Sequence, residues 1–279
     1  MTVLDRNIHQ VAMDVWHDQN QAVVIAGISF ASVTMGQAVE RIVRLAENPD
    51  GAHQICTANL DHLAMVRRNP VFRAAYHDAD MVLADGMPVV WLSQLVGRQG
   101  LPERVAGSDL LWELGRASAR TGIRLFYLGG APGAAEEAAA AVTARFPGAQ
   151  VCGCYCPSFE DFGTPEEEGR ITTAIRAAQP QALLVGLGAP KQEIWIAANK
   201  ERLGVPVCIG VGGSFEMAAG RVRRAPRWMQ RTGLEWSYRL IQEPARLWRR
   251  YLLRDLPTLV SLLWATWFSR MAANRLGRS

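Results

Sequence analysis

A chain of 279 residues with 49% hydrophobic composition is long enough to bury a full core, which excludes an intrinsically disordered protein. Its five cysteines are odd in number and lack the spacing of a secreted disulfide framework, so we expect reduced thiols in a cytosolic protein. The net charge of +4 is unevenly placed: residues 221–279 carry thirteen arginines and three acidic residues, a net of +10, which leaves −6 for residues 1–220.

Short apolar runs alternate with helical patterns through the first 220 residues. Strands are expected at 23–28, 55–58, 81–84, 124–128 and 150–156, and two more are expected between 182 and 220. Helices are expected at 34–46, 60–68, 71–77, from 88 onward, and at 108–119, 134–146 and 165–179. This alternation predicts an α/β fold, Rossmann-like, with a mostly parallel sheet and helices on both faces.

Two strand–turn–helix units between Ala182 and Gly220 form the expected anion site. In each unit an apolar run ends in glycines, and a residue that favours a helix start follows, Pro190 in the first and Ser214 in the second. Backbone N–H groups and the positive ends of helix dipoles then face one edge of the sheet. The segment is therefore predicted to hold an anion such as a diphosphate.

Polar side chains follow three of the predicted strands, where a buried strand does not require them. Asp85 precedes a glycine, so it is either a turn former or a general base that faces the cleft. Thr57 and Asn59 are either a helix cap and a turn or hydrogen-bonding groups that orient a substrate. Gln192 and Glu193 follow the first glycine turn of the anion site.

Motifs for common cofactors and metals are weak. The glycines of Gly129-Gly130-x-x-Gly133 follow a strand and open a helix, but their spacing differs from the dinucleotide-binding fingerprint. Asp78-Ala-Asp80 mimics an acidic metal-binding pair of nucleotide-sugar transferases, yet two solvated acids are the ordinary outcome at the end of a helix. We expect neither a metal nor a cofactor.

The composition changes after Gly220. Residues 221–279 show no strand pattern and hold five of the nine tryptophans. We therefore place a domain boundary near Arg221, between an α/β core of residues 1–220 and a helical appendage of residues 221–279. The longest apolar run, residues 256–268, is shorter than the roughly 20 residues of a spanning helix, so no membrane span is expected.

The arginines of the appendage allow several interpretations. A solvated basic helix is the simplest, whereas the interleaved tryptophans favour an anionic membrane surface over nucleic acid. Arg239, Arg246 and Arg249 are spaced to lie near one helical face, where they could neutralise a diphosphate without a metal. Tryptophan-rich surfaces could also pair two protomers, so a homo-oligomer stays open.

Taken together, eight ordered motifs resemble the WecG/TagA/CpsF glycosyltransferase family. The resemblance extends from about Val24 to Tyr251. The motifs are Thr57-x-Asn59, Ala84-Asp85-Gly86, Arg104-Val-Ala-Gly-Ser-Asp109, Phe126-Tyr-Leu-Gly-Gly130, Val185-Gly-Leu-Gly-Ala-Pro-Lys-Gln-Glu193, Gly210-Val-Gly-Gly-Ser-Phe-Glu216, Arg224-Ala-Pro226 and Gly233-Leu-Glu-Trp-x-Tyr-Arg239.

This resemblance implies a metal-independent, inverting transferase without a cofactor. Such an enzyme moves a hexose-type sugar from a UDP-sugar to a polyprenyl-diphosphate-linked saccharide. It is peripheral to the cytoplasmic face of the bacterial inner membrane, where it builds exopolysaccharides or other surface polysaccharides. Family members use UDP-N-acetylmannosamine, UDP-glucuronate, UDP-glucose or UDP-galactose, and the sequence does not choose among them.

The resemblance also assigns residues. Those expected in catalysis are the base Asp85 and the polar residues Thr57, Asn59 and Gln192. Those expected to bind substrate are Arg104, the uridine-loop residues Gly212, Gly213 and Glu216, and the appendage arginines Arg239, Arg246 and Arg249. The chain departs from the family pattern at Ala84, where many members have proline, and at Glu216, where aspartate is more usual.

The resulting hypothesis places a UDP-sugar at the glycine turns, with helix N-termini and appendage arginines stabilising the departing UDP. Asp85 takes the proton of the acceptor hydroxyl as this attacks the anomeric carbon from the opposite face. Two other classes stay open. A peripheral membrane scaffold would keep the fold without catalysis, and a nucleotide-sugar oxidoreductase would bind NAD.

Overall fold

The computed structural model describes residues 22–96, 100–158 and 160–264. The side chains of Arg227, Arg231 and Arg246 lie outside this description, as do residues 1–21 and the end of the expected appendage, residues 265–279. The assignment of Arg246 to substrate binding therefore stays a prediction.

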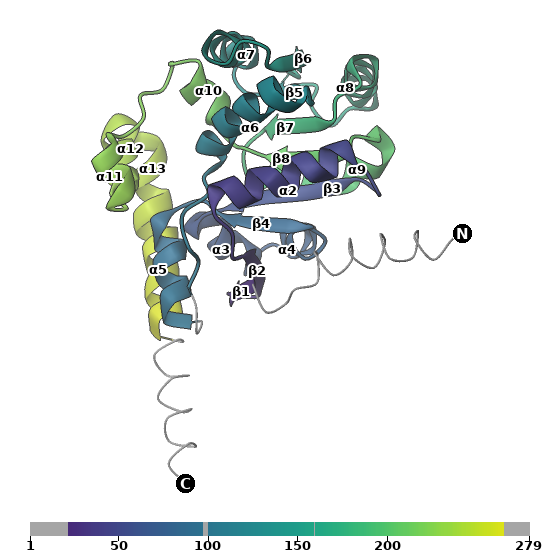
Figure 1. Ribbon diagram of the computed structural model, residues 1–279. Coiled ribbons are helices and arrows are strands. Elements are labelled where there is room, and N and C mark those ends of the chain that lie inside the picture. Colours follow the sequence, from purple (N-terminus) through teal and green to yellow (C-terminus); the bar gives the residue numbers. More distant parts are fainter. Residues whose placement is uncertain (1–21, 97–99, 159, 265–279) are drawn as a thin grey trace, which may run out of the picture.

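A six-stranded parallel sheet forms the centre of the protein (Figure 1). Its strand order is β4-β3-β8-β7-β5-β6, so the chain starts near one edge, crosses to the other and returns to the middle. The strands are β3 (His53–Ala58), β4 (Met81–Ala84), β5 (Arg124–Gly129), β6 (Gln150–Tyr155), β7 (Ala182–Gly186) and β8 (Val207–Gly210). The predicted α/β fold with a mostly parallel sheet is confirmed.

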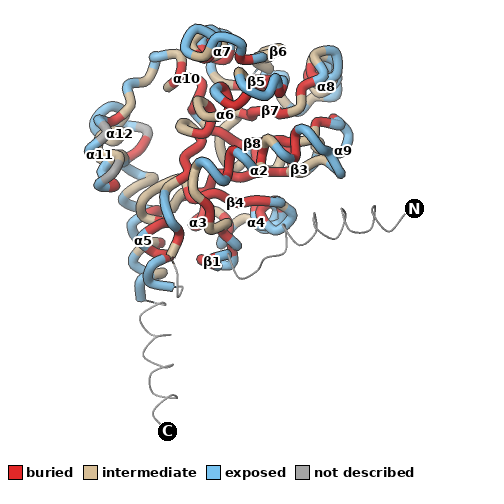
Figure 2. The backbone as a smooth tube through the Cα atoms, viewed as in Figure 1, coloured by how far each residue is buried: buried red, intermediate tan, exposed pale blue. Residues whose placement is uncertain are grey.

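Helices cover both faces of this sheet because neighbouring strand residues point to opposite sides. Ile55 joins a core cluster with α2 (Met35–Glu47), α6 (Gly107–Thr121), α7 (Ala134–Arg145) and α10 (Ser214–Ala218). Its neighbour Cys56 joins the opposite cluster, with α3 (Leu60–Val66), α4 (Pro70–His77) and α5 (Met87–Val96). A third cluster packs α8 (Pro165–Ala178) and α9 (Lys191–Leu203) on the other strands. Figure 2 shows the central strands buried and the outer surfaces of α7, α8 and α9 exposed.

The first predicted strand, 23–28, is wrong in one respect, because the chain reverses within it. An antiparallel hairpin is formed by β1 (Ala22–Ile25) and β2 (Ile28–Ala31). Its two-residue turn places Ala26 at φ 52° and Gly27 at φ 83°. Positive φ at both turn residues matches the right-handed twist of hairpin strands. The turn was not predicted from the sequence because its first position is alanine, whereas such turns usually have asparagine, aspartate or glycine there.

Helices follow the core. They are α11 (Arg227–Arg231), α12 (Glu235–Gln242), α13 (Pro244–Trp248) and the π-helical η2 (Arg249–Asp255), which continues as an α-helix over residues 256–264. Figure 1 shows this last helix running beside α5, and its Leu259 and Leu262 pack on the cluster that contains Val90 of α5. Within the described ranges, no helix has both the length and the apolar character needed to cross a bilayer.

An acidic and basic cluster sits at the N-terminal ends of the strands. His53 contacts Asp80 through Nδ1 at 3.1 Å and Asp50 through Nε2 at 2.7 Å, and Asp80 also accepts from Lys200 at 3.3 Å. The hydrogen bond with Asp80, supported by Asp50, raises the pKa of His53 above its usual value. Asp80 thus takes part in ion pairs at the opposite end of the strands from Asp85.

The raised pKa of His53 predicts a pH-dependent part of the folding free energy. Protonated His53 stabilises the fold, so its contribution is fully present below about pH 6.5, the unfolded value, and is lost as pH rises through the folded value. The stability advantage of the wild-type protein over His53→Gln should therefore be larger at pH 5.5 than at pH 8.5. Urea unfolding of both proteins at the two pH values measures this difference, and an equal gap at both would contradict it.

Candidate active site

Asp85 and Asn59 lie together at the carboxyl edge of the sheet. Ala58 and Ala84 are register partners in β3 and β4, so the residues after them leave the sheet at the same level. The Asp85 backbone N–H donates to the Ala58 carbonyl at 2.8 Å, which holds the two turns against each other. The sequence prediction that these polar residues share one edge is therefore confirmed.

Asp85 is half-buried, and charged residues both before and after Gly220 lie close enough to act on its carboxyl. Burial raises its pKa to about 6, with Glu235 and Asp109 adding to the rise while Arg104 and Arg239 oppose it. A carboxylate with a pKa near the working pH is well suited to accept a proton. The pKa of Asp85 is thus set by residues before Gly220 and by residues after it.

Thr57 and Asn59 make bonds within the protein. Thr57 is buried, and its hydroxyl donates to the Gly210 carbonyl of β8 at 2.9 Å. The Asn59 side-chain carbonyl accepts from the backbone N–H groups of Asp61 at 3.0 Å and His62 at 3.4 Å, which caps α3. The helix-cap alternative for Asn59 is what the structure shows, and contacts of either residue with substrate stay predictions.

Gln192 lies behind the glycine turns rather than in front of them. It is 1% exposed, and its Oε1 accepts from the Gly188 N–H at 3.2 Å and the Gly212 N–H at 3.0 Å. One buried amide therefore ties the turn after β7 to the turn after β8. The structure gives Gln192 a role in holding the two turns.

The helix starts of these turns differ from the sequence expectation. Pro190 precedes α9, which begins at Lys191, and Gly213 precedes α10, so Ser214 is the first helical residue rather than the cap. The Ser214 hydroxyl instead donates to the Val211 carbonyl, a bond within the turn. The prediction of Ser214 as N-cap is wrong because the helix begins one residue earlier than expected, at Ser214 itself.

Glu216 joins the turn after β8 to the turn after β5. Its Oε1 accepts from the Ala131 N–H at 2.8 Å, while its Oε2 is buried without a hydrogen-bond partner among the described residues. Gly212 takes φ +55°, a conformation that favours glycine. A buried acceptor beside exposed glycine turns suits a ligand that offers an N–H group.

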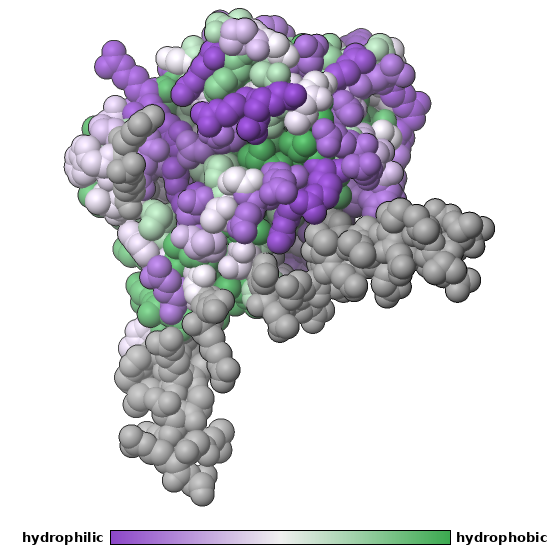
Figure 3. Space-filling view, in the orientation of Figure 1, coloured by the Kyte–Doolittle hydropathy of each residue, from purple (hydrophilic) through white to green (hydrophobic). Residues whose placement is uncertain are grey.

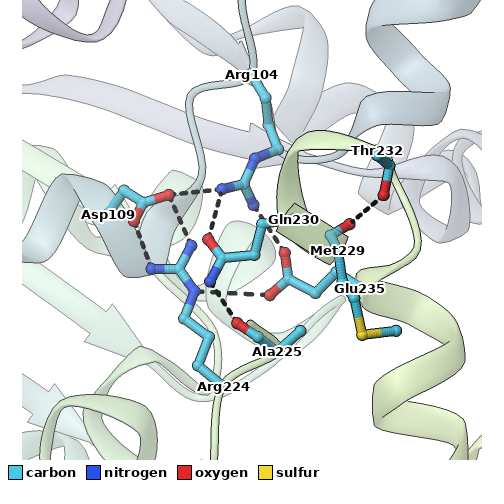
Figure 4. Close-up of polar contacts among 8 residues, drawn as sticks. All are labelled: Arg104, Asp109, Arg224, Ala225, Met229, Gln230, Thr232 and Glu235. Atoms are coloured by element: carbon cyan, nitrogen blue, oxygen red, sulfur yellow. Dashed lines mark hydrogen bonds and ion pairs between the residues drawn. The ribbon is translucent and has the colours of Figure 1, made fainter. Parts of the chain in front are cut away.

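Arg104 lies in an ion-pair network that attaches the appendage to the core (Figure 4). Its guanidinium donates to Asp109 of α6 at 2.8 Å and to Glu235 of α12 at 2.9 Å. Arg224 binds both carboxylate oxygens of Asp109 and lies 3.7 Å from Glu235. Two arginines and two acids therefore neutralise one another beside Asp85. Sequence reasoning missed Asp109 and Glu235 as partners, although both lie inside motifs that it quoted.

The appendage arginines occupy different environments. Arg239 of α12 is partly buried, its Nε has no hydrogen-bond partner in the described part of the chain, and it lowers the pKa of Asp85. Arg249 is exposed, with its guanidinium over the Trp248 ring at 5.3 Å. The structure thus brings Arg239 to Asp85 and places Arg249 at the surface.

A second charged cluster, missed by sequence reasoning, fastens η2 to α3. Asp61 is buried and pairs with Arg250 at 3.0 Å and with Arg254. Burial and the nearby Asp61 raise the pKa of the neighbouring Asp255. The two arginines are four residues apart and so lie on one helical face, and this spacing could have predicted a shared acidic partner.

No group of three or more potential metal-ligating residues occurs in the ranges that the structure describes. The five cysteines are free thiols, as the sequence predicts. Among the described residues, the site brings together the Asp85 carboxyl of raised pKa, the two glycine turns, the Glu216 oxygen without a hydrogen-bond partner and the partly buried Arg239.

Fold and candidate site together define an α/β protein with polar residues gathered at the carboxyl edge of a doubly wound sheet, the edge where such folds bind ligands. Comparison with known proteins identifies the family: the sequence model of the Glycosyl transferase WecG/TagA/CpsF family matches residues 23–272. The chain belongs to this family of glycosyltransferases. It is similar to the N-acetylglucosaminyldiphosphoundecaprenol N-acetyl-beta-D-mannosaminyltransferase of Bacillus spizizenii, with 36% identity over 198 residues, covering 71% of this chain and 74% of that protein.

Proposed function

We propose that this protein is an inverting hexosyltransferase that uses a UDP-sugar donor and a polyprenyl-diphosphate-linked saccharide acceptor. The observation that carries the proposal is the position of Asp85 at the carboxyl edge of the sheet, where its backbone N–H binds the Ala58 carbonyl and where Arg104 and Arg239 lie close enough to lower its raised pKa. In an inverting transfer, a single base suffices, because the nucleotide leaves as a stabilised anion.

Each part of the site takes one role. Asp85 removes the proton of the acceptor hydroxyl as this attacks the anomeric carbon and the bond to UDP breaks. The turn of Gly212 and Gly213 and the free oxygen of Glu216 hold the uridine, whose ring N–H matches that oxygen. Arg239, with Arg246 and Arg249 from the same appendage, neutralises the departing diphosphate.

The name of the Bacillus relative supports the acceptor and suggests which donor to test first. That protein transfers N-acetylmannosamine to a lipid-diphosphate-linked N-acetylglucosamine, as its name states. We infer an acceptor of the same chemical class for this chain, in bacterial surface polysaccharide synthesis. Among the candidate donors, UDP-N-acetylmannosamine has the strongest support.

The surface of the last helix supports a peripheral position on an anionic membrane, at its cytoplasmic face. Its inner side pairs with Asp61 through Arg250 and Arg254 and packs on the core through Leu259 and Leu262. Its outer side carries exposed apolar residues, namely Leu252, Leu253, Leu256, Val260, Leu263 and Trp264. Trp91 and Val96 of α5 are exposed as well, and Figure 3 shows hydrophobic surface in this region. An apolar outer face is unfavourable in water and favourable at a bilayer surface.

A UDP-release assay tests the proposal. The protein is mixed with each candidate donor and with lipid-diphosphate-linked sugars in vesicles that contain anionic lipid, and flotation of the vesicles in the same samples reports membrane binding. We expect acceptor-dependent UDP release with one donor, and flotation with the vesicles. Flotation without UDP release from any donor would favour a scaffold, and NAD binding in a fluorescence titration would favour an oxidoreductase.

A further inference from the structure

Glu193 is a buried carboxyl next to the site, and the proposed mechanism does not use it. Its side chain is 0% exposed, and burial raises its pKa to about 7. The backbone carbonyl of Glu193 accepts from Gln54 Nε2 at 3.0 Å, which anchors the start of α9 to β3. Burying a carboxyl is costly, and an apolar residue would fill the same space without this cost.

The contact that this carboxyl makes is with the clamp between the two glycine turns. Glu193 Oε1 accepts from Gln192 Nε2 at 2.8 Å. The opposite end of the same amide, Oε1, receives the N–H groups of Gly188 and Gly212. A side-chain amide has one accepting and one donating end, so an acceptor behind Gln192 determines which end faces the turns.

A reversed amide would place an NH₂ group against two N–H donors and would leave all of them unsatisfied in a buried place. Space is also tight here, because a Cβ added to Gly210 would lie 2.8 Å from Gln192 Nε2. The Nε2 end of Gln192 thus packs closely against the backbone of β8. Glu193 accepts from this end and adds to the orientation that the two glycine N–H groups favour.

We propose that Glu193 is a positioning residue for the donor site: by accepting the Gln192 amide, it holds the turns of Gly188 and Gly212 at the spacing that the nucleotide diphosphate requires. The binding consequence rests on the proposed function, whereas the effect on the turns does not. Glu193 acts through Gln192 and does not touch the substrate.

Two substitutions separate this role from simple space filling. Glu193→Met keeps a similar length and removes the acceptor, and Glu193→Gln keeps an acceptor oxygen at the same place. Hydrogen exchange of the unliganded protein is measured for peptides spanning residues 186–192 and 210–216, with residues 165–178 as the control region. We expect faster exchange in both turns of Glu193→Met, no change in the control region, and exchange close to wild type in Glu193→Gln.

Calorimetric titration with UDP and steady-state kinetics follow on the same proteins. Glu193→Met should weaken UDP binding and raise the donor KM about tenfold, with kcat changed less than about threefold. Because Glu193 acts through Gln192, adding Glu193→Met to Gln192→Met should weaken UDP binding no further than Gln192→Met alone.

The proposal would be overturned by unchanged exchange in both turns of Glu193→Met, by Glu193→Gln being as impaired as Glu193→Met, or by additive losses in the double variant. Exchange that rises equally in the control region would also overturn it, because that result describes general destabilisation. If the wild-type protein binds no UDP, the proposed function fails, and the exchange comparison still decides the role of Glu193.

Discussion

Replacing Asp85 by asparagine is expected to lower kcat by about 10²–10⁴-fold while UDP binding stays within about twofold of the wild-type value. The carboxylate is the proton acceptor, whereas the donor is held by the glycine turns and the arginines. Because burial raises the pKa of Asp85 to about 6, wild-type turnover should rise with pH through about pH 6 and level off above it. The residual rate of Asp85→Asn should lack this step.

Stability gives an independent signature for the same variant. A carboxyl whose folded pKa lies above its unfolded value of 3.8 costs the folded state free energy once it ionises, so the cost grows from about pH 4 and levels above about pH 6. At pH 8, Asp85→Asn should therefore be more stable than the wild type by about 1–2 kcal/mol, with no gain at pH 3.5.

The matched control for this experiment is Asp78→Asn, the same chemical change at an exposed acid that ends α4. It should retain both the wild-type rate and the wild-type pH profile. Full turnover in Asp85→Asn, or a pH step near 6 that survives the substitution, would exclude Asp85 as the base. Loss of activity with loss of stability would instead indicate a structural role.

Most of the sheet and its helices could be predicted from local patterns, because each strand is a short apolar run and each helix has a period or a cap. Met81–Ala84 was predicted at its observed bounds, and the helix expected at 34–46 is found as α2 at Met35–Glu47. The strand order could not be predicted in this way, because it depends on which apolar faces pack together in three dimensions. The hairpin at Ala26 was missed because its turn residue is atypical.

The sequence predicted which residues lie at the candidate site better than it predicted which contacts each of them makes. Parallel strand ends bring Asn59 and Asp85 to one edge, which the strand pattern alone implies. The pattern could not reveal that Gln192 hydrogen-bonds the backbone of the glycine turns. Nor could it reveal that Arg104 forms ion pairs with Asp109 and Glu235. Such pairings join residues far apart in the sequence, and no local signal encodes them.

The same distinction applies to the arginines of the appendage. Spacing along the chain placed Arg239, Arg246 and Arg249 near one helical face. The chain changes helix between α12, α13 and η2, so a single helical period does not hold across these positions. Arg239 is consequently partly buried beside Asp85, while Arg249 is exposed. Their contributions to transfer should differ accordingly.

Arg239→Gln is expected to lower kcat/KM for the donor by about 10²–10³-fold, the loss typical of removing one preorganised donor to a developing anion. Arg239 lies close enough to Asp85 to lower its pKa, which places its positive charge beside the proposed reaction centre. Arg249→Gln should cost less, because that guanidinium is exposed and lies over Trp248. The control Arg44→Gln, which removes an exposed pair with Glu40, should retain wild-type activity.

A shift in the pH profile would show that Arg239 and Asp85 share one site. Arg239 lowers the pKa of Asp85, so its removal should move the rising limb of turnover to higher pH. Arg239→Lys keeps the charge without the planar fork, and it should restore the position of the limb but only part of the rate. A limb that stays in place in Arg239→Gln, or a loss of rate equal to that of Arg249→Gln, would contradict the assignment. In that case the diphosphate charge would have to be neutralised by the turn N–H groups alone.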